Sequence, residues 1–230
     1  MNQIIVALDV DSRAEALRLV GQLRQRVGLF KVGSQLFTAE GPELVREIVR
    51  QGEKVFLDLK FHDIPNTVGK AVAAAARLGV SMLTLHTAGG LKMLSAAVAA
   101  VNRLPAAVER PLLLGVTVLT SLADEDLAQV GVDAGAALQV SRLAGLAEEA
   151  GLGGIVASPE ELGPLRRQLG SALKIVTPGI RPAGSDLNDQ SRIATPAAAL
   201  RAGADYLVIG RPITASSDPP ASLEKILSKL

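Results

Sequence analysis

Eight short runs rich in β-branched and aliphatic residues recur along the chain, and this recurrence limits the possible folds more than any other feature of the sequence. Several runs are apolar almost throughout instead of alternating with polar residues. Such runs are typical of strands that are buried on both faces of a parallel sheet. The runs are IIVAL (4–8), LFKVG (29–33), KVFLDL (54–59), MLTLH (82–86), LLLGVTVL (112–119), GIVAS (154–158), KIVTPGI (174–180) and YLVIG (206–210).

Helical patterns with start and stop signals separate these runs. We expect helices to begin after Ser12, at Pro42, after Ser158 and after Thr195, because each position carries a capping residue or a first-turn proline. Gly52 is the predicted end of the helix that Pro42 begins.

This series of strand and helix units predicts an α/β fold, a (β/α)8 TIM barrel, as a single catalytic domain over residues 1–230. A doubly wound open sheet is the alternative. Such a sheet usually has a glycine-rich turn after its first strand, and the corresponding turn here, ALDVDSRAEA, has no glycine. The barrel is therefore favoured, and no linker or change in composition marks a second domain.

Composition and charge argue against nucleic acid as a partner. The chain is 48% hydrophobic and 20% charged, as expected for a globular protein, and its net charge is +1. One Tyr, four Phe and no Trp provide few surfaces on which bases could stack.

The same data predict a cytoplasmic protein that has no membrane partner. Cysteine is absent, which excludes disulfides and cysteine nucleophiles and suits a reducing compartment. The start, MNQIIVALDV, lacks the basic segment and long apolar core of a secretory signal. The longest apolar runs are too short to span a bilayer.

Polar residues gather where the predicted strands end. In a barrel of this kind the chemistry lies at the carboxyl ends of the strands. One polar strand end would be unremarkable, but charged residues on neighbouring strands predict a site. The residues at or just after strand ends are Asp9, Lys31, Asp58, Lys60, His86, Thr120, Arg181, Gly210 and Arg211.

The stretch DLKFHDIP (58–65) is the strongest candidate for chemistry. Side chains alternate along a strand, so Asp58 and Lys60 should share one face, and Lys31 of the neighbouring strand can share it too. Asp63 follows in the loop. We expect a lattice of alternating charge, in which a lysine aimed into a cavity can stabilise a carbanion and then protonate it.

Two other interpretations of this stretch stay open. Asp9, Asp58 and Asp63 could bind Mg²⁺, although the interleaved ammonium groups would repel the metal. The charges could also form a structural ion-pair network without chemistry. His62 and His86 are expected to have structural, hydrogen-bonding roles.

A phosphate site is predicted at the ends of the last two strands. Gly210 in IGRP allows close backbone approach, and Arg211 offers a fork for phosphate oxygens. The long loop PGIRPAGSDLNDQSRIA (178–194) is expected to act as a lid, with Arg181 and Gln190 as its phosphate contacts.

Six segments together resemble the bacterial-type orotidine 5'-phosphate decarboxylase family, in the right order over nearly the whole chain. They are ALDV (7–10), FKVG (30–33), DLKFHDIPNT (58–67), GVTVLTS (115–121), PGIRP (178–182) and IGRP (209–212).

The resemblance implies a cofactor-free, metal-free conversion of orotidine 5'-phosphate to uridine 5'-phosphate (UMP) and CO₂, the last step of de novo UMP synthesis. It implies that Lys60 is the proton donor to C6 of the pyrimidine, that Asp58 lies near the departing carboxylate, and that Lys31 and Asp9 hold ribose hydroxyls. It also implies a homodimer in which Asp63 and Thr67 enter the neighbouring subunit's site.

The remaining substrate contacts are implied in the same way. Thr120 would contact the base, while Arg181, Gln190, Gly210 and Arg211 would surround the phosphate. Two rival functions are a Mg²⁺-dependent sugar-phosphate decarboxylase or aldolase of the same barrel group, and a non-catalytic nucleotide-binding barrel. The Mg²⁺-dependent relatives carry an acid where this chain has Lys31, which ranks them below the first reading.

Overall fold

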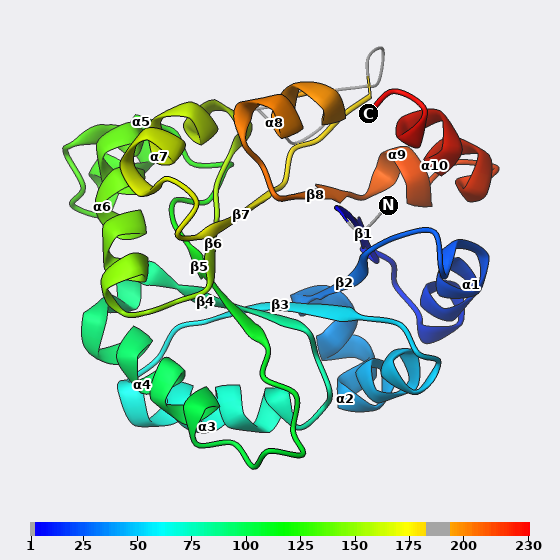
Figure 1. Cartoon of the computed structure of the whole chain (residues 1–230), viewed down its shortest axis with the longest axis horizontal. Coiled ribbons are helices and arrows are strands. Elements are labelled where there is room, and N and C mark those ends of the chain that lie inside the picture. Colours follow the sequence, from blue (N-terminus) through cyan, green and yellow to red (C-terminus); the bar gives the residue numbers. More distant parts are fainter. Residues whose placement is uncertain (1–2, 183–193) are drawn as a thin grey trace.

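The strands form a closed parallel barrel in chain order (Figure 1). The computed structural model describes residues 3–182 and 194–230. Pairing of β1 with both β2 and β8 closes the sheet, so the barrel prediction is confirmed and the open sheet is wrong. The strands are β1 (Ile4–Ala7), β2 (Leu29–Gly33), β3 (Val55–Phe61), β4 (Met82–His86), β5 (Leu112–Val116), β6 (Gly154–Val156), β7 (Lys174–Thr177) and β8 (Tyr206–Ile209).

Helices surround the barrel on its outside (Figure 1). They are α1 (Arg13–Leu23), α2 (Ser34–Arg50), α3 (Pro65–Ala76), α4 (Gly90–Asn102), α5 (Asp124–Gln129), α6 (Gly135–Glu149), α7 (Leu162–Leu169), α8 (Pro196–Ala202), α9 (Arg211–Thr214) and α10 (Pro219–Leu227), with the 3₁₀ turns η1 (Thr87–Gly89) and η2 (Pro159–Glu161).

Alternation along the strands divides the apolar residues into two layers. In β1, Ile4 and Val6 face the helices, whereas Ile5 and Ala7 face the barrel interior. The inner layer fills the barrel, so the interior is a packed core and not a pore. It consists of Ile5, Ala7, Leu29, Phe56, Met82, Leu114, Val176 and Val208.

Three of the predicted helix starts are formed by side-chain caps. The Ser12 hydroxyl accepts a hydrogen bond from the Glu15 N–H at 3.3 Å, and Thr195 caps α8 in the same way through the Ala198 N–H. Before η2, the Glu161 carboxylate accepts from the Ser158 N–H at 2.7 Å. These bonds satisfy N–H groups that have no partner inside the helix.

The helix predicted to begin at Pro42 begins earlier, at Ser34. Gly41 interrupts it with φ +68°, a conformation that glycine adopts without strain, and Pro42 then opens the second half. Gly52, with φ +86°, follows the end of α2 as predicted.

Three predicted strands extend at least two residues beyond the observed ones. The run 112–119 is strand only to Val116, the run 154–158 only to Val156, and the run 174–180 only to Thr177. Val118 and Ile180 are nevertheless buried. Apolar character therefore indicated burial correctly, but strand pairing stops earlier, because the short neighbour β6 ends opposite Val116 and Val176.

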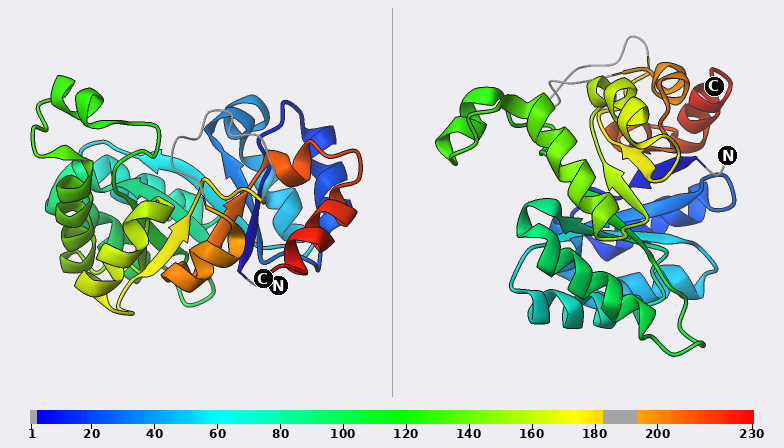
Figure 2. Two further views of the ribbon diagram at one scale, coloured as in Figure 1. Left: turned by 90° about the horizontal axis from the view of Figure 1, so that it is seen from above. Right: turned by 60° about the vertical axis from the view of Figure 1, so that its left-hand side comes forward.

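The helix α5 stands out from the barrel at the end opposite the chain termini (Figure 2). Leu127 is buried at its attachment to the body, while Val130 just beyond it is exposed. Within the described ranges, no helix combines the length and apolar character needed to cross a membrane.

Candidate functional site

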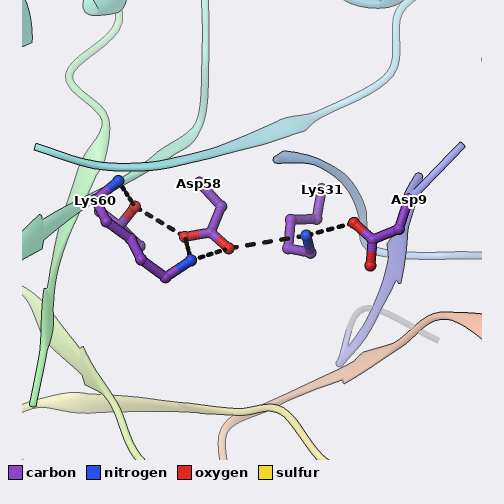
Figure 3. Close-up of polar contacts among 5 residues, drawn as sticks. Asp9, Lys31, Asp58 and Lys60 are labelled. Atoms are coloured by element: carbon purple, nitrogen blue, oxygen red, sulfur yellow. Dashed lines mark hydrogen bonds and ion pairs between the residues drawn. The ribbon is translucent and has the colours of Figure 1, made fainter. Parts of the chain in front are cut away.

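Four charged side chains of alternating sign form a row at the carboxyl ends of β1, β2 and β3 (Figure 3). The Lys60 ammonium donates to both carboxylate oxygens of Asp58, each at 2.9 Å. On the other side of Asp58, the Lys31 Nζ lies 3.8 Å from its Oδ2 and 2.9 Å from Asp9 Oδ1. The structure thus brings together four of the predicted site residues, which we call the charged tetrad.

Strand alternation explains the positions of three tetrad members. Asp9, Lys31 and Asp58 each lie two residues beyond an interior residue of the same segment, so each points toward the barrel axis. Those interior residues are Ala7, Leu29 and Phe56.

Lys60 reaches the tetrad by a different route from the one predicted. The pairing of β3 with β4 shifts after Leu57, and Lys60 has φ +51°. Simple alternation through Leu59 is therefore wrong as the reason that Asp58 and Lys60 share a face. A bulge in the strand, combined with a left-handed residue, turns the Lys60 side chain back onto Asp58.

The four side chains of the tetrad differ in their exposure to solvent. The side chains of Lys31 and Asp58 are 12% and 13% exposed, whereas those of Lys60 and Asp9 are 34% and 55% exposed. The attraction between Lys31 and Asp58 is therefore screened least by water. A ligand above the barrel would meet Lys60 and Asp9 first.

Two residues that support the tetrad were not predicted as site residues. Thr84 of β4 hydrogen-bonds both to Asp58 and to the backbone of Lys60. A Cβ at Gly33 would lie 3.1 Å from Lys31 Nζ, so glycine leaves room for the ammonium. Counting in twos from Met82 would have placed Thr84 on the interior face beside Asp58.

At the predicted phosphate end, Arg181 and Arg211 lie within electrostatic reach of each other. Burial, and then the charge of Arg211, lower the pKa of Arg181. Arg181 is 7% exposed, and its Nε has no hydrogen-bond partner in the described part of the chain. Two neighbouring guanidinium cations, one of which has a buried N–H that needs an acceptor, form a suitable binding site for an anion. Gly210 follows β8 as the N-cap of α9 and lies beside Asp9, and Gln190 lies outside the described residues.

Three further predicted residues are not members of the charged tetrad. Asp63 and Thr67 are exposed in and just after the loop into α3, and Asp63 accepts a hydrogen bond from the N–H of Ile64 at 2.6 Å. Thr120 is partly buried in the turn between β5 and α5, four residues beyond the strand it was predicted to end.

The two histidines pack against each other. The His62 and His86 ring centroids lie 5.6 Å apart. Burial lowers the pKa of His86, and the charges of His62 and Lys60 lower it further, against a smaller raising effect of Asp58. Within residues 3–182 and 194–230 neither ring has a hydrogen bond, so the predicted structural role rests on ring packing instead.

The arrangement of acids does not resemble a metal centre. Among the described residues, no three His, Asp or Glu side chains gather as potential metal ligands. The Lys31 ammonium lies between Asp9 and Asp58, where a shared cation would have to bind.

A closed barrel with a polar site at the carboxyl ends of its strands defines a TIM-barrel enzyme. The family model described as "Orotidine 5'-phosphate decarboxylase / HUMPS family" matches residues 2–226. The chain belongs to the orotidine 5'-phosphate decarboxylase family.

Named relatives agree with that assignment over nearly the full length. The orotidine 5'-phosphate decarboxylases of Syntrophotalea carbinolica and Moorella thermoacetica are each 54% identical, over 99% and 100% of this chain and 94% and 92% of theirs. A crystal structure of orotidine 5'-phosphate decarboxylase from Lactobacillus acidophilus is 38% identical, with TM-score 0.88, and the match covers 98% of this chain and 97% of that one.

Proposed function

We propose that this protein decarboxylates orotidine 5'-phosphate to UMP and CO₂ at the charged tetrad. The observation that carries the proposal is the Lys60 ammonium held on both oxygens of Asp58, with Lys31 behind it. The full-length similarity to enzymes named for this reaction supports it.

The proposed chemistry uses the charge of Lys60 twice. When the bond from C6 to the carboxylate breaks, CO₂ leaves and the electron pair stays on C6, in the plane of the ring. The Lys60 ammonium stabilises this pair and then transfers a proton to C6, and solvent later reprotonates the neutral amine. A unit charge at ~4 Å contributes roughly 4 kcal/mol at an effective dielectric near 20, or about three decades of rate.

That contribution is too small for so difficult a reaction, so binding energy from the rest of the substrate must add to it. Arg181, Arg211, Gly210 and Gln190 would hold the phosphate, with closure of the 178–194 loop excluding water. The Nε of Arg181, which has no hydrogen-bond partner among the described residues, lies near the charge of Arg211 and supports this assignment. Lys31 and Asp9 would bind ribose hydroxyls, and Thr120 would contact the base.

The proposal includes a homodimer with shared sites, in which Asp63 and Thr67 reach the partner's substrate. The exposure of both residues, and the 65% exposed Ile64 between them, supports a surface that a second subunit covers. Asp63 would then add a second carboxylate opposite the substrate's own.

The decisive experiment measures turnover of orotidine 5'-phosphate by the purified protein in excess EDTA, followed by ultraviolet absorbance with UMP identified by chromatography. We expect full conversion. Activity that disappears with EDTA and returns with Mg²⁺ would instead favour the metal-dependent rival. A folded protein that binds UMP without turnover would favour the binding-only barrel.

Site sharing is tested by mixing two inactive variants, Lys60→Ala and Asp63→Ala. Each mixed dimer should contain one site with both residues intact, so free exchange should restore about a quarter of the wild-type activity. Subunit exchange is checked with differently tagged chains. No recovery despite exchange would place Asp63 in its own subunit's site. The cytoplasmic location stays a prediction, for cell fractionation to test.

A further inference from the structure

The bulge that positions Lys60 has one residue opposite it on the neighbouring strand. Leu57 pairs with Leu83, and Phe61 pairs with Leu85. Three residues of β3, from Asp58 to Lys60, therefore lie opposite Thr84 alone. An ordinary ladder cannot satisfy the backbone of such a segment, so its geometry depends on other contacts.

The Thr84 hydroxyl supplies two of those contacts. It lies 2.9 Å from the Lys60 backbone nitrogen and 3.0 Å from Asp58 Oδ1. A backbone N–H can only donate, so the hydroxyl accepts from Lys60 and its own proton points to the Asp58 carboxylate. Thr84 is fully buried, so bulk water does not compete for these hydrogen bonds.

These hydrogen bonds connect both the backbone and the side chain of Lys60 to the hydroxyl oxygen of Thr84. Its backbone is held directly by Thr84, and its ammonium is held through Asp58, to both of whose oxygens it donates. The left-handed φ of Lys60 is unfavourable for a residue with a side chain, so the conformation needs such support.

We propose that Thr84 is a positioning residue, whose hydroxyl sets the place and direction of the Lys60 ammonium relative to Asp58. The inference rests on the proposed function for its catalytic consequence. Thr84 lies beneath the acid and the backbone that it holds, and it acts on the reaction only through them.

The test compares Thr84→Val, which keeps the branched shape but removes the hydroxyl, with Thr84→Ser, which keeps the hydroxyl. We expect Thr84→Val to lower kcat about 10- to 100-fold, as small misplacements of a reacting group do. KM and the Kd for UMP should stay within about threefold, because the ribose and phosphate contacts are untouched. Thr84→Ser should retain kcat within about threefold of wild type.

A matched control separates positioning from loss of stability. Thr87 is also fully buried, and its hydroxyl donates at 2.6 Å to the Val116 carbonyl, which is not part of the tetrad. Thr87→Val should lower Tm to a similar extent as Thr84→Val and leave kcat within about threefold.

Three results would overturn the inference: unchanged kcat in Thr84→Val, equal losses in Thr84→Val and Thr87→Val, or no rescue by serine. If wild type itself fails to convert orotidine 5'-phosphate, the proposed function falls, and hydrogen exchange of the Lys60 amide decides the positioning role. That exchange should quicken in Thr84→Val and not in Thr84→Ser, and equal rates in all three proteins would refute it.

Discussion

Two ion-pair clusters lie at opposite ends of the barrel, and they use their donors differently. At the amino end, Arg166, Lys174 and Asp205 connect α7, β7 and the residue before β8. At the carboxyl end lies the charged tetrad. Both combine lysine or arginine with aspartate on neighbouring elements, so residue type alone does not distinguish them.

The amino-end cluster satisfies itself. Besides its ion pair with Asp205, Arg166 donates to the carbonyls of Gly203, Gly170 and Leu173, at 2.8 to 2.9 Å. Asp205 accepts from the Ile175 N–H at 2.8 Å and from Lys174 at 2.9 Å. Such a set of bonds to the backbone fixes the chain.

The tetrad leaves donors unused. Each ammonium has three N–H bonds, and in the described part of the chain Lys31 donates one and Lys60 donates two, all to carboxylates. Both ammonium groups lie at the carboxyl end of the barrel, where the substrates of such barrels bind. The comparison suggests that the structural cluster is distinguished by its bonds to the backbone, whereas the two ammonium groups of the site bond only to carboxylates in the described part of the chain.

The largest expected effect in this comparison comes from removing the ammonium at one end of the tetrad, that of Lys60. Lys60→Ala should lower kcat by at least about 10⁴-fold, because it removes both the proton donor and the stabilising charge. Tm should change by no more than a few degrees, since the side chain is partly exposed. Steady-state turnover and a thermal melt with UMP test both parts. Substantial residual turnover would remove Lys60 from its role.

The opposite pattern is expected at the amino end. Asp205→Asn should lower the free energy of unfolding by about 1–3 kcal/mol and leave kcat/KM unchanged, because it breaks two charge-assisted bonds far from the site. Denaturant unfolding and turnover at neutral pH measure these quantities. A change in kcat/KM without loss of stability would contradict the assignment of this cluster to structure.

The stability difference should also depend on pH. Burial by itself raises the pKa of Asp205, but hydrogen bonds from Ile175, Lys174 and Arg166 outweigh it and hold the pKa below its ordinary value. The stabilisation is therefore complete above the unfolded-state pKa, ordinarily 3.8, and is lost as pH falls through the lower folded-state pKa. The gap between wild type and Asp205→Asn should shrink in that acidic range.

The smallest effect should come from Lys174→Met in the same cluster. This side chain is 52% exposed, so its ion pair with Asp205 is screened by water and should contribute less than about 1 kcal/mol. Denaturant unfolding in low and high salt tests this, with wild type as the reference. A loss as large as that of Asp205→Asn would mean that Lys174, not Arg166, is the main partner.

Sequence reasoning predicted the features that depend on pattern along one segment. The barrel, the approximate strand positions and the shared face of Lys31 and Asp58 all follow from apolar runs and alternation. It also predicted that Lys60 lies beside Asp58, but for an incorrect reason. The bulge in β3 is set by pairing with β4, and no pattern within DLKFHDIP marks it.

The features that sequence analysis missed depend on contacts between segments far apart in the chain. Thr84 becomes important only because it lies opposite the bulge, and Gly33 only because Lys31 needs the space. Arg166 and Asp205 were not predicted, because a charged residue outside a motif can be assigned an ion-pair partner only when the fold is known. The residues whose roles depend on contacts with distant parts of the chain were therefore the hardest to identify.

The bulge in β3 has a consequence for anyone who wishes to build this chemistry into another barrel. A copied DLKFHDIP segment in a regular sheet would continue the ordinary pleat, and Lys60 would lose its left-handed backbone and its aim at Asp58. The smallest portable unit is the pair of strands β3 and β4, with Thr84 opposite the extra residues. Engineering should treat that pair as one part, with its register included.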